Sequence, residues 1–207
     1  MYTPPAFKDD DVESVRAAMR NARLANLVTS TANGLFATPL PLFLDATEGE
    51  HGVLYGHLAK ANPQWRSAPV GEGLAIFMGP EAYVSPSWYA TKRETGKVVP
   101  TWNYVAVQAQ GPVEFFHEPD RLLEVVTRLT NLHESPRSAP WAVDDAPADF
   151  IASQLRGIVG VRMVIAKLSG KRKMSQNRNE ADRIGVAAGL GASEMPRDRE
   201  AASLIPT

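Results

Sequence analysis

The spacing of apolar residues divides the chain into one early helix and a long run of strands. Val12, Val15, Met19 and Ala22 recur at helical spacing, which predicts an N-terminal amphipathic helix over residues 10–24. Beyond this helix, short apolar or alternating runs bounded by turn residues predict strands. They cover residues 25–31, 36–45, 49–58, 73–79, 81–86, 100–116 and 160–173, the last being one strand or a hairpin.

Glycine and proline pairs mark the turns between these strands. Asn33-Gly34 is the strongest short hairpin signal in the chain. Gly79-Pro80 predicts a tight turn that pairs 73–79 with 81–86, and Gly111-Pro112 predicts a bend within 100–116. Two prolines within 36–45 predict an edge strand or a bulge, because proline cannot donate to a sheet.

Helices between consecutive strands are few. Short helices are predicted over 59–66 and 150–157, and a longer one over 119–133. Residues 1–8 are expected to form an extended arm, 87–100 a loop and 134–147 a connection. A C-terminal helical tail, at about residues 178–207, is expected to end the fold on the surface.

The succession of strands decides the predicted fold class. Six or seven strands with little helix between them favour an antiparallel barrel over a doubly wound parallel sheet. The prediction is therefore a mainly β protein with flanking helices, built as one domain over residues 1–207. Closing the sheet into a barrel also removes exposed strand edges.

Composition excludes several classes of function. The chain has no cysteine, so disulfides and thiolate metal sites are excluded, and its four histidines lack metal-ligand spacing. We therefore predict no metal site. The net charge of −1 gives no support for a nucleic-acid-binding face. No apolar run approaches the ~20 residues that span a bilayer, and the N-terminus lacks signal-peptide features, so we expect a cytoplasmic protein without a membrane segment.

The first candidate site is the stretch VLYGHLAKANPQWR at 53–66. Its predicted strand ends near His57, Lys60 follows, and Asn62-Pro63 begins a short helix. The free N–H groups of a helix start favour an anion, and all three side chains offer donors to a phosphate. The alternatives are that Lys60 is a solvated surface lysine and that His57 has a structural role, either capping the turn or filling space in the packing. Trp65 is expected in the core.

The second candidate is Thr101-Trp102-Asn103-Tyr104. Along a strand, residues 101 and 103 share one face, and residues 102 and 104 share the other. One face then offers a hydroxyl and an amide, and the other two aromatic rings, which suits a flat heterocycle with polar edges. An aromatic core strand with a polar outer face is the alternative.

The third candidate is SGKRKMSQNRN at 169–179. A basic run from Lys171 to Lys173 is typical of a solvated hairpin tip, whereas the amide-rich Ser175-Gln176-Asn177 that follows has no use there. No helix-turn-helix pattern surrounds the run, so DNA contact is weakly supported. No nucleophile elbow, P-loop or dinucleotide fingerprint precedes a helix, and no catalytic residue is identified.

Five motifs occur in order along the chain: MYTPPAF, HLAKANPQW, YVSPSWY, VPTWNYVAVQAQG and GKRKMSQNR. Together they closely resemble the PaiB-like family, described as FMN-binding negative transcriptional regulators, over about residues 1–190. That family resembles a branch of the flavin split-barrel superfamily, alongside the pyridoxamine phosphate oxidases. The resemblance implies a six-stranded antiparallel split β-barrel that forms a homodimer and holds FMN at the subunit interface.

The resemblance also implies roles for particular residues. Lys60 would point at the FMN phosphate. Thr101, Trp102 and Asn103 would line the flavin or the adjacent pocket, and Lys173, Ser175 and Gln176 would close the site. Two family histidines are replaced here by Ala6 and Gln108, so histidine chemistry or haem-like ligation is not expected.

Three functions follow from these patterns. The first is an FMN-binding, PaiB-like protein, with possible flavin-dependent redox of a small molecule. The second is a non-catalytic negative transcriptional regulator that acts through DNA or a protein partner without flavin. The third is a barrel that has kept the fold and lost the cofactor.

Overall fold

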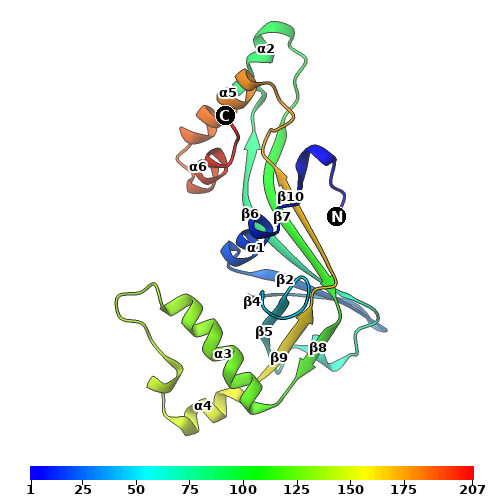
Figure 1. Cartoon of the computed structure of the whole chain (residues 1–207), viewed down its shortest axis with the longest axis vertical. Coiled ribbons are helices and arrows are strands. Elements are labelled where there is room, and N and C mark those ends of the chain that lie inside the picture. Colours follow the sequence, from blue (N-terminus) through cyan, green and yellow to red (C-terminus); the bar gives the residue numbers. More distant parts are fainter. The chain divides into compact units, whose positions relative to one another are not determined.

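The computed structural model describes residues 1–207, which group into two compact units (Figure 1). Unit 1 comprises Met1–Asn21, Met78–Val107 and Ser169–Thr207, and unit 2 comprises Ala22–Phe77 and Gln108–Leu168. Each unit thus gathers segments that are far apart in the sequence. The prediction of a single domain stays a prediction.

Ten strands form two sheets, against the six or seven strands predicted. The six-stranded sheet has the order β1-β10-β7-β6-β2-β3, and the four-stranded sheet has the order β4-β5-β9-β8. Antiparallel pairing, as predicted, is found between β2 and β3, β2 and β6, β4 and β5, β5 and β9, β8 and β9, and β1 and β10. The strands are β1 (Lys8–Asp9), β2 (Ala25–Thr31), β3 (Gly34–Leu40), β4 (Leu42–Asp45), β5 (Val53–Ala59), β6 (Gly73–Val84), β7 (Thr101–Gly111), β8 (Val113–Phe116), β9 (Ile158–Val164) and β10 (Lys167–Lys173).

The predicted turn at Gly79-Pro80 is wrong, because β6 runs through it as one strand. Burial explains how a proline is accommodated. Gly73, Ala75 and Phe77 are buried, but after the pair the buried positions are Ala82 and Val84, so the alternation shifts by one residue. Such a shift is typical of a bulge, where proline is tolerated. The first half of β6 buries side chains within unit 2 and the second half within unit 1.

Prolines break two other predicted strands. Residues 36–45 become β3 and β4, separated at Pro41, and both strands lie at sheet edges, as the prolines predicted. Residues 100–116 become β7 and β8, separated at Pro112. A Cβ at Gly111 would collide with the carbonyl oxygen of Val164, so this close approach requires glycine. Residues 160–173 are neither one strand nor a hairpin, because β9 and β10 belong to different sheets.

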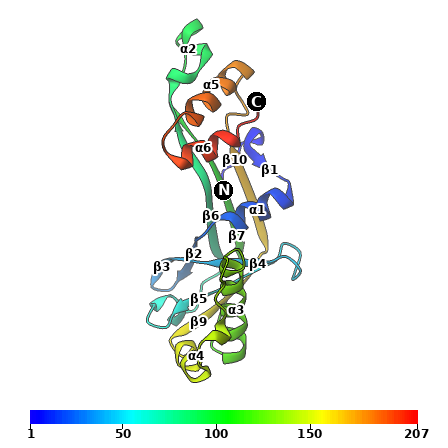
Figure 2. The same cartoon turned by 90° about the vertical axis from the view of Figure 1, so that its left-hand side faces the viewer.

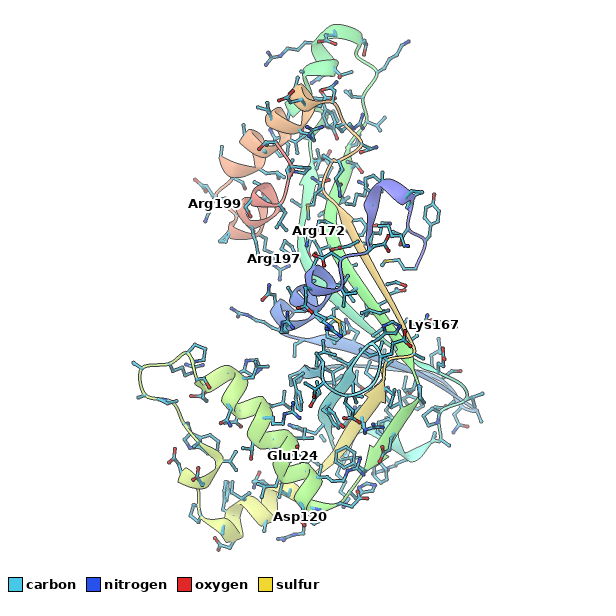
Figure 3. All side chains as sticks on the ribbon, in the orientation of Figure 1. Asp120, Glu124, Lys167, Arg172, Arg197 and Arg199 are labelled. Carbon is cyan, nitrogen blue, oxygen red and sulfur yellow. The ribbon has the colours of Figure 1, made fainter.

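In unit 2, α3 (Pro119–Glu134) and α4 (Ala148–Leu155) pack on the four-stranded sheet (Figure 1). Both helices lie close to their predicted ranges. The apolar face of α3 presents Leu122, Val125 and Leu129 to Phe43 and Phe116 of the sheet. Asp120 and Glu124 are labelled on α3 in Figure 3, and both are exposed. The connection before α4 contains one 3-10 turn, η4 (Val143–Asp145).

In unit 1, the C-terminal segment forms α5 (Glu180–Gly191) and α6 (Pro196–Ser203). It is helical as predicted, but it is not a surface tail. Val186, Leu190 and Ala201 are fully buried and share a core with Val84 of β6 and Val105 of β7. Figure 2 shows both helices in front of the strands of this unit. The N-terminal helix α1 (Val12–Asn21) lies within its predicted range.

Residues 87–100 are not a plain loop, because they contain the end of η3 (Pro86–Trp88) and α2 (Ala90–Thr95). The buried carboxylate of Asp182 accepts hydrogen bonds from the backbone N–H of Thr91 at 2.9 Å and from its hydroxyl at 2.9 Å. These bonds fasten α2 to the first turn of α5. The predicted extended arm contains a single 3-10 turn, η1 (Pro5–Phe7). None of the helices is both long and apolar enough to cross a membrane.

Candidate functional site

Lys60 lies in the turn that follows β5, with its backbone held from two sides. Its N–H donates to the carbonyl oxygen of Gly157 at 2.8 Å, and its own carbonyl oxygen accepts from Nε1 of Trp65 at 3.0 Å. The side chain is exposed. The turn therefore fixes the position of the Cα atom and leaves the ammonium group accessible to an anion.

Asn62 shapes this turn rather than leaving its amide free. Its Oδ1 accepts from the N–H of Gln64 at 2.9 Å and caps η2 (Pro63–Arg66), and its Nδ2 donates to Oγ1 of Thr38 at 2.9 Å. The predicted helix over 59–66 is thus a single 3-10 turn whose first free N–H is already satisfied. Lys60 is the better candidate for contact with a ligand.

Gln64 is the residue of this corner that the sequence did not reveal. It is fully buried, and its Nε2 donates to the carbonyl oxygen of Leu27 and to Oγ1 of Thr29, both at 3.1 Å. Its Oε1 accepts from Thr38 at 2.6 Å. A buried amide with three partners fixes the turn to strands β2 and β3. The order Asn-Pro-Gln after a strand was the only available signal.

His57 lies on β5 opposite Gly160 of β9 and is half-buried. Strand alternation places it on the face of Tyr55, which packs against the core under α3. Burial lowers the pKa of His57, so the imidazole is neutral near pH 7. Trp65 is half-buried rather than in the core, and its ring meets His117 edge-on with centroids 5.0 Å apart.

The second and third candidate motifs meet directly in unit 1. Nζ of Lys173 donates to Oγ1 of Thr101 at 2.7 Å and to the carbonyl oxygen of Trp102. Asn103 and Ser175 are both buried and hydrogen-bonded to each other at 3.1–3.2 Å. Segments 72 residues apart in the sequence are therefore joined through their polar side chains.

The turn after β10 is held by its own amides. Ser175 is the one non-glycine residue with a positive φ, at 61°. Oε1 of Gln176 accepts from the N–H of Met174 at 2.6 Å, and its Nε2 donates to the carbonyl oxygen of Arg172. The amides of Asn103 and Gln176 thus brace the backbone, and their place in cofactor binding stays a prediction.

The basic run is not the solvated hairpin tip that was predicted. Lys171, Arg172 and Lys173 lie within β10, where Lys171 pairs with Lys8 of β1. Arg172, labelled in Figure 3, contacts Asp9 at 3.5 Å and donates to Ser14 at 3.0 Å. Lys171 is only 8% exposed, because strand pairing draws the run into the fold.

The N-terminal MYTPPAF arm lies against this lysine strand. Lys171 donates to the carbonyl oxygen of Tyr2 at 3.2 Å, and its ammonium lies 5.1 Å from the ring centroid of Tyr104. Lys173 lies 5.8 Å from the ring centroid of Phe7. Nothing in the composition of the arm indicated this contact. Ala6, in place of a family histidine, is exposed.

The polar and aromatic side chains at the start of β7 lie on opposite faces, as predicted, but the aromatic face is the more exposed one, so the alternative of an aromatic core strand is wrong. Asn103 is fully buried, whereas Trp102 is 56% exposed on the opposite face. The Trp102 ring meets Tyr83 of β6 edge-on, with centroids 5.9 Å apart at 72°. Two partly exposed rings side by side offer apolar area to a planar ligand.

Taken residue by residue, His57, Lys60 and Asn62 belong to unit 2, and the other six predicted residues belong to unit 1. That the two groups share one pocket stays a prediction. The donor set fits a flavin phosphate at Lys60, and the exposed ring of Trp102 suits a planar ligand at the flavin or beside it. No three His, Asp or Glu side chains are grouped so that they could hold a metal ion.

Comparison with known proteins supports the predicted fold and family. Residues 1–167 match the family model described as "Putative FMN-binding domain". "Protease synthase and sporulation protein PAI 2" of Bacillus subtilis (strain 168) is 34% identical over 99% of this chain and 96% of its own length. An uncharacterized protein of Emericella nidulans is 32% identical over 92% of this chain and 90% of its own length.

Solved structures share the fold at low identity. The FAD and heme binding protein from Mycobacterium smegmatis has a TM-score of 0.58 and 15% identity, covering 88% of this chain and 80% of that one. The flavocytochrome Anf3 from Azotobacter vinelandii has a TM-score of 0.56 and 16% identity, covering 86% and 75%. The predicted class, a mainly β split barrel with flanking helices, is confirmed. The chain belongs to the FMN-binding domain family and is a PaiB-like protein.

Proposed function

We propose that the chain binds FMN and uses it in the redox chemistry of a small molecule. The observation that carries the proposal is Lys60, whose exposed ammonium group stands on a turn fixed by hydrogen bonds, in a chain of the FMN-binding domain family. A bound flavin supplies electron transfer that no side chain provides. The role of the protein is to hold and orient it.

The phosphate contact is the part that this chain can supply most directly. A phosphate monoester has a charge of about −1.5 to −2 at pH 7. A hydrogen bond between charged groups contributes roughly 1.5–3 kcal/mol, which corresponds to about 10- to 150-fold in affinity. Because the Lys60 backbone is already held, the ordering on binding is confined to its side chain.

Flavin binding is tested by the absorbance spectrum of the purified protein and by titration with FMN. In Lys60→Ala we expect FMN to bind at least about tenfold more weakly and riboflavin to bind unchanged, because riboflavin has no phosphate. Lys167→Ala is the control, since Lys167 is also an exposed lysine of unit 2, labelled in Figure 3. Equal losses for both ligands would remove the phosphate role from Lys60. No binding of FMN at micromolar concentration would end the proposal.

We also propose that the protein is a homodimer with its flavin site at the subunit interface, in the cytoplasm. The support is the family resemblance carried by the five motifs. Sedimentation velocity with and without FMN tests the dimer. A monomer at all concentrations, with FMN bound at a stoichiometry of one, would refute the interface site.

A negative transcriptional regulator acting without flavin is the alternative, and the resemblance to the PaiB-like family, described as negative transcriptional regulators, is its support. The basic run that motivated DNA contact lies within strand β10, and its Arg172 contacts Asp9. This weakens the case for direct binding of DNA. A salt titration of DNA affinity separates the two functions, because phosphate contacts produce a steep loss of affinity with salt. A flavin-free barrel is the outcome if both ligands fail.

A further inference from the structure

Strand alternation in unit 1 separates two chemically different faces. Val105 of β7 and Met174 of β10 pack into the core with α5 and α6. Side chains alternate along a strand, so the residues next to Val105 and Met174, and every second residue from those, lie on the opposite face. That face has three aromatic residues and two lysines, Tyr83, Trp102, Tyr104, Lys171 and Lys173, and we call it the lysine–aromatic face.

The lysines of this face lack acidic partners within unit 1. Asp9, the carboxylate on the neighbouring strand β1, is 3.5 Å from Arg172 and accepts from Ser14 at 2.6 Å, on the side that faces α1. Lys171 and Lys173 instead contact carbonyl oxygens, a hydroxyl and aromatic rings. A buried lysine is ordinarily paired, so buried Lys171 and half-buried Lys173, both without a carboxylate partner, leave a local excess of positive charge.

The surroundings of Lys173 agree with such an excess. Burial lowers the pKa of Lys173, and the positive charges of Lys171 and Arg178 lower it further. An anion placed beside the two ammonium groups would offset this repulsion. The adjacent rings of Trp102 and Tyr83, which are 56% and 46% exposed, offer area for an aromatic body.

We infer that the lysine–aromatic face binds a small aromatic anion, a carboxylate or a phosphate attached to a planar ring. The two lysines hold the anionic group, and Trp102 and Tyr83 contact the ring. The ligand is the small molecule that reacts with the flavin, so the inference rests on the proposed function, and its binding is tested without flavin bound. It identifies the class of small molecule on which a flavin-dependent activity would act.

Calorimetry on the purified full chain with benzoate, phenyl phosphate and benzyl alcohol tests the inference. We expect both anions to bind and benzyl alcohol, which has the ring without the charge, to bind at least about tenfold more weakly. The preferred anion identifies the headgroup. Equal binding of benzoate and benzyl alcohol, or binding of neither anion at millimolar concentration, would overturn the inference.

Variants locate the site. Lys171→Met and Lys173→Met should each weaken the preferred anion about tenfold or more, while Lys97→Met, an exposed lysine of unit 1, leaves it unchanged. If either methionine variant fails to fold, Lys171→Arg and Lys173→Arg are tested instead; they keep the charge and should retain binding. In the wild-type protein, addition of the preferred anion should shift the indole N–H signal of Trp102 in the NMR spectrum. An unshifted Trp102 signal would refute the site.

The same measurements are repeated with FMN present. Additive binding of FMN and the aromatic anion supports two ligands. Displacement of the anion by FMN would show that this face belongs to the cofactor and would overturn the inference. Failure of FMN to bind at all would refute the proposed cofactor and leave the anion site standing if benzoate still binds.

Discussion

The buried amide of Gln64 gives the sharpest test of how the Lys60 corner is held. In Gln64→Leu the side chain keeps a similar size but loses its bonds to Thr29, Thr38 and the Leu27 carbonyl. Two or three buried polar groups then lack a partner, at about 1–3 kcal/mol each. Burying the apolar leucine offsets about 1–2 kcal/mol. We expect the free energy of unfolding to fall by about 2–4 kcal/mol.

Urea denaturation followed by circular dichroism measures this loss, with Gln154→Leu as the matched control. Gln154 is exposed on α4, so its replacement should change the free energy of unfolding by less than about 0.5 kcal/mol. A double-mutant cycle with Thr38→Val should give a coupling energy of at least about 1 kcal/mol, because the two side chains share a 2.6 Å hydrogen bond. A loss below about 1 kcal/mol for Gln64→Leu would refute the reasoning, as would additive effects.

Three further predictions address the packing, the strained turn and the half-buried histidine. In Gly189→Ala the new Cβ overlaps the Trp88 indole, so the free energy of unfolding should fall by about 1–3 kcal/mol, whereas Gly191→Ala, with open space around it, should be neutral or stabilising by up to about 1 kcal/mol. Ser175→Ala should lower the free energy of unfolding by about 1–3 kcal/mol, because buried Asn103 loses its partner. Ser175→Gly should lower it by about 1 kcal/mol less, since glycine tolerates the φ of 61°. Equal losses for the two variants in urea denaturation would contradict this. Because burial lowers the folded-state pKa of His57, the unfolded state binds more protons below about pH 6.5, so stability should fall there and stay level above it. His57→Gln should flatten that dependence between pH 5 and 8, and exposed His133→Gln should not, as urea midpoints at each pH will show.

Sequence reasoning succeeded where the evidence was local. The hairpin at Asn33-Gly34 joins β2 and β3, and α3 matches the helix predicted over 119–133 within one residue. It failed where a local turn signal was overridden by pairing partners. Gly79-Pro80 looks like a turn, yet Gly79 packs against Val105 of a strand that the sequence places more than twenty residues later.

The site shows the same division in a form that matters for function. Residue types alone were enough to select the motifs around Asn103 and Ser175 as candidates. They could not predict that the two side chains contact each other, because an amide and a hydroxyl can each face a ligand or one another. The structure pairs them, and so leaves Lys60, Trp102, Lys171 and Lys173 as the groups with capacity for a ligand. Lys171 looked like one charge in a solvated run, since the sequence could not show that the N-terminal arm lies against its strand. The burial of Lys171 depends on a contact with Tyr2, 169 residues away, and only the structure shows that contact. Because Lys171 also lacks a carboxylate partner within unit 1, the basic run becomes a candidate anion site.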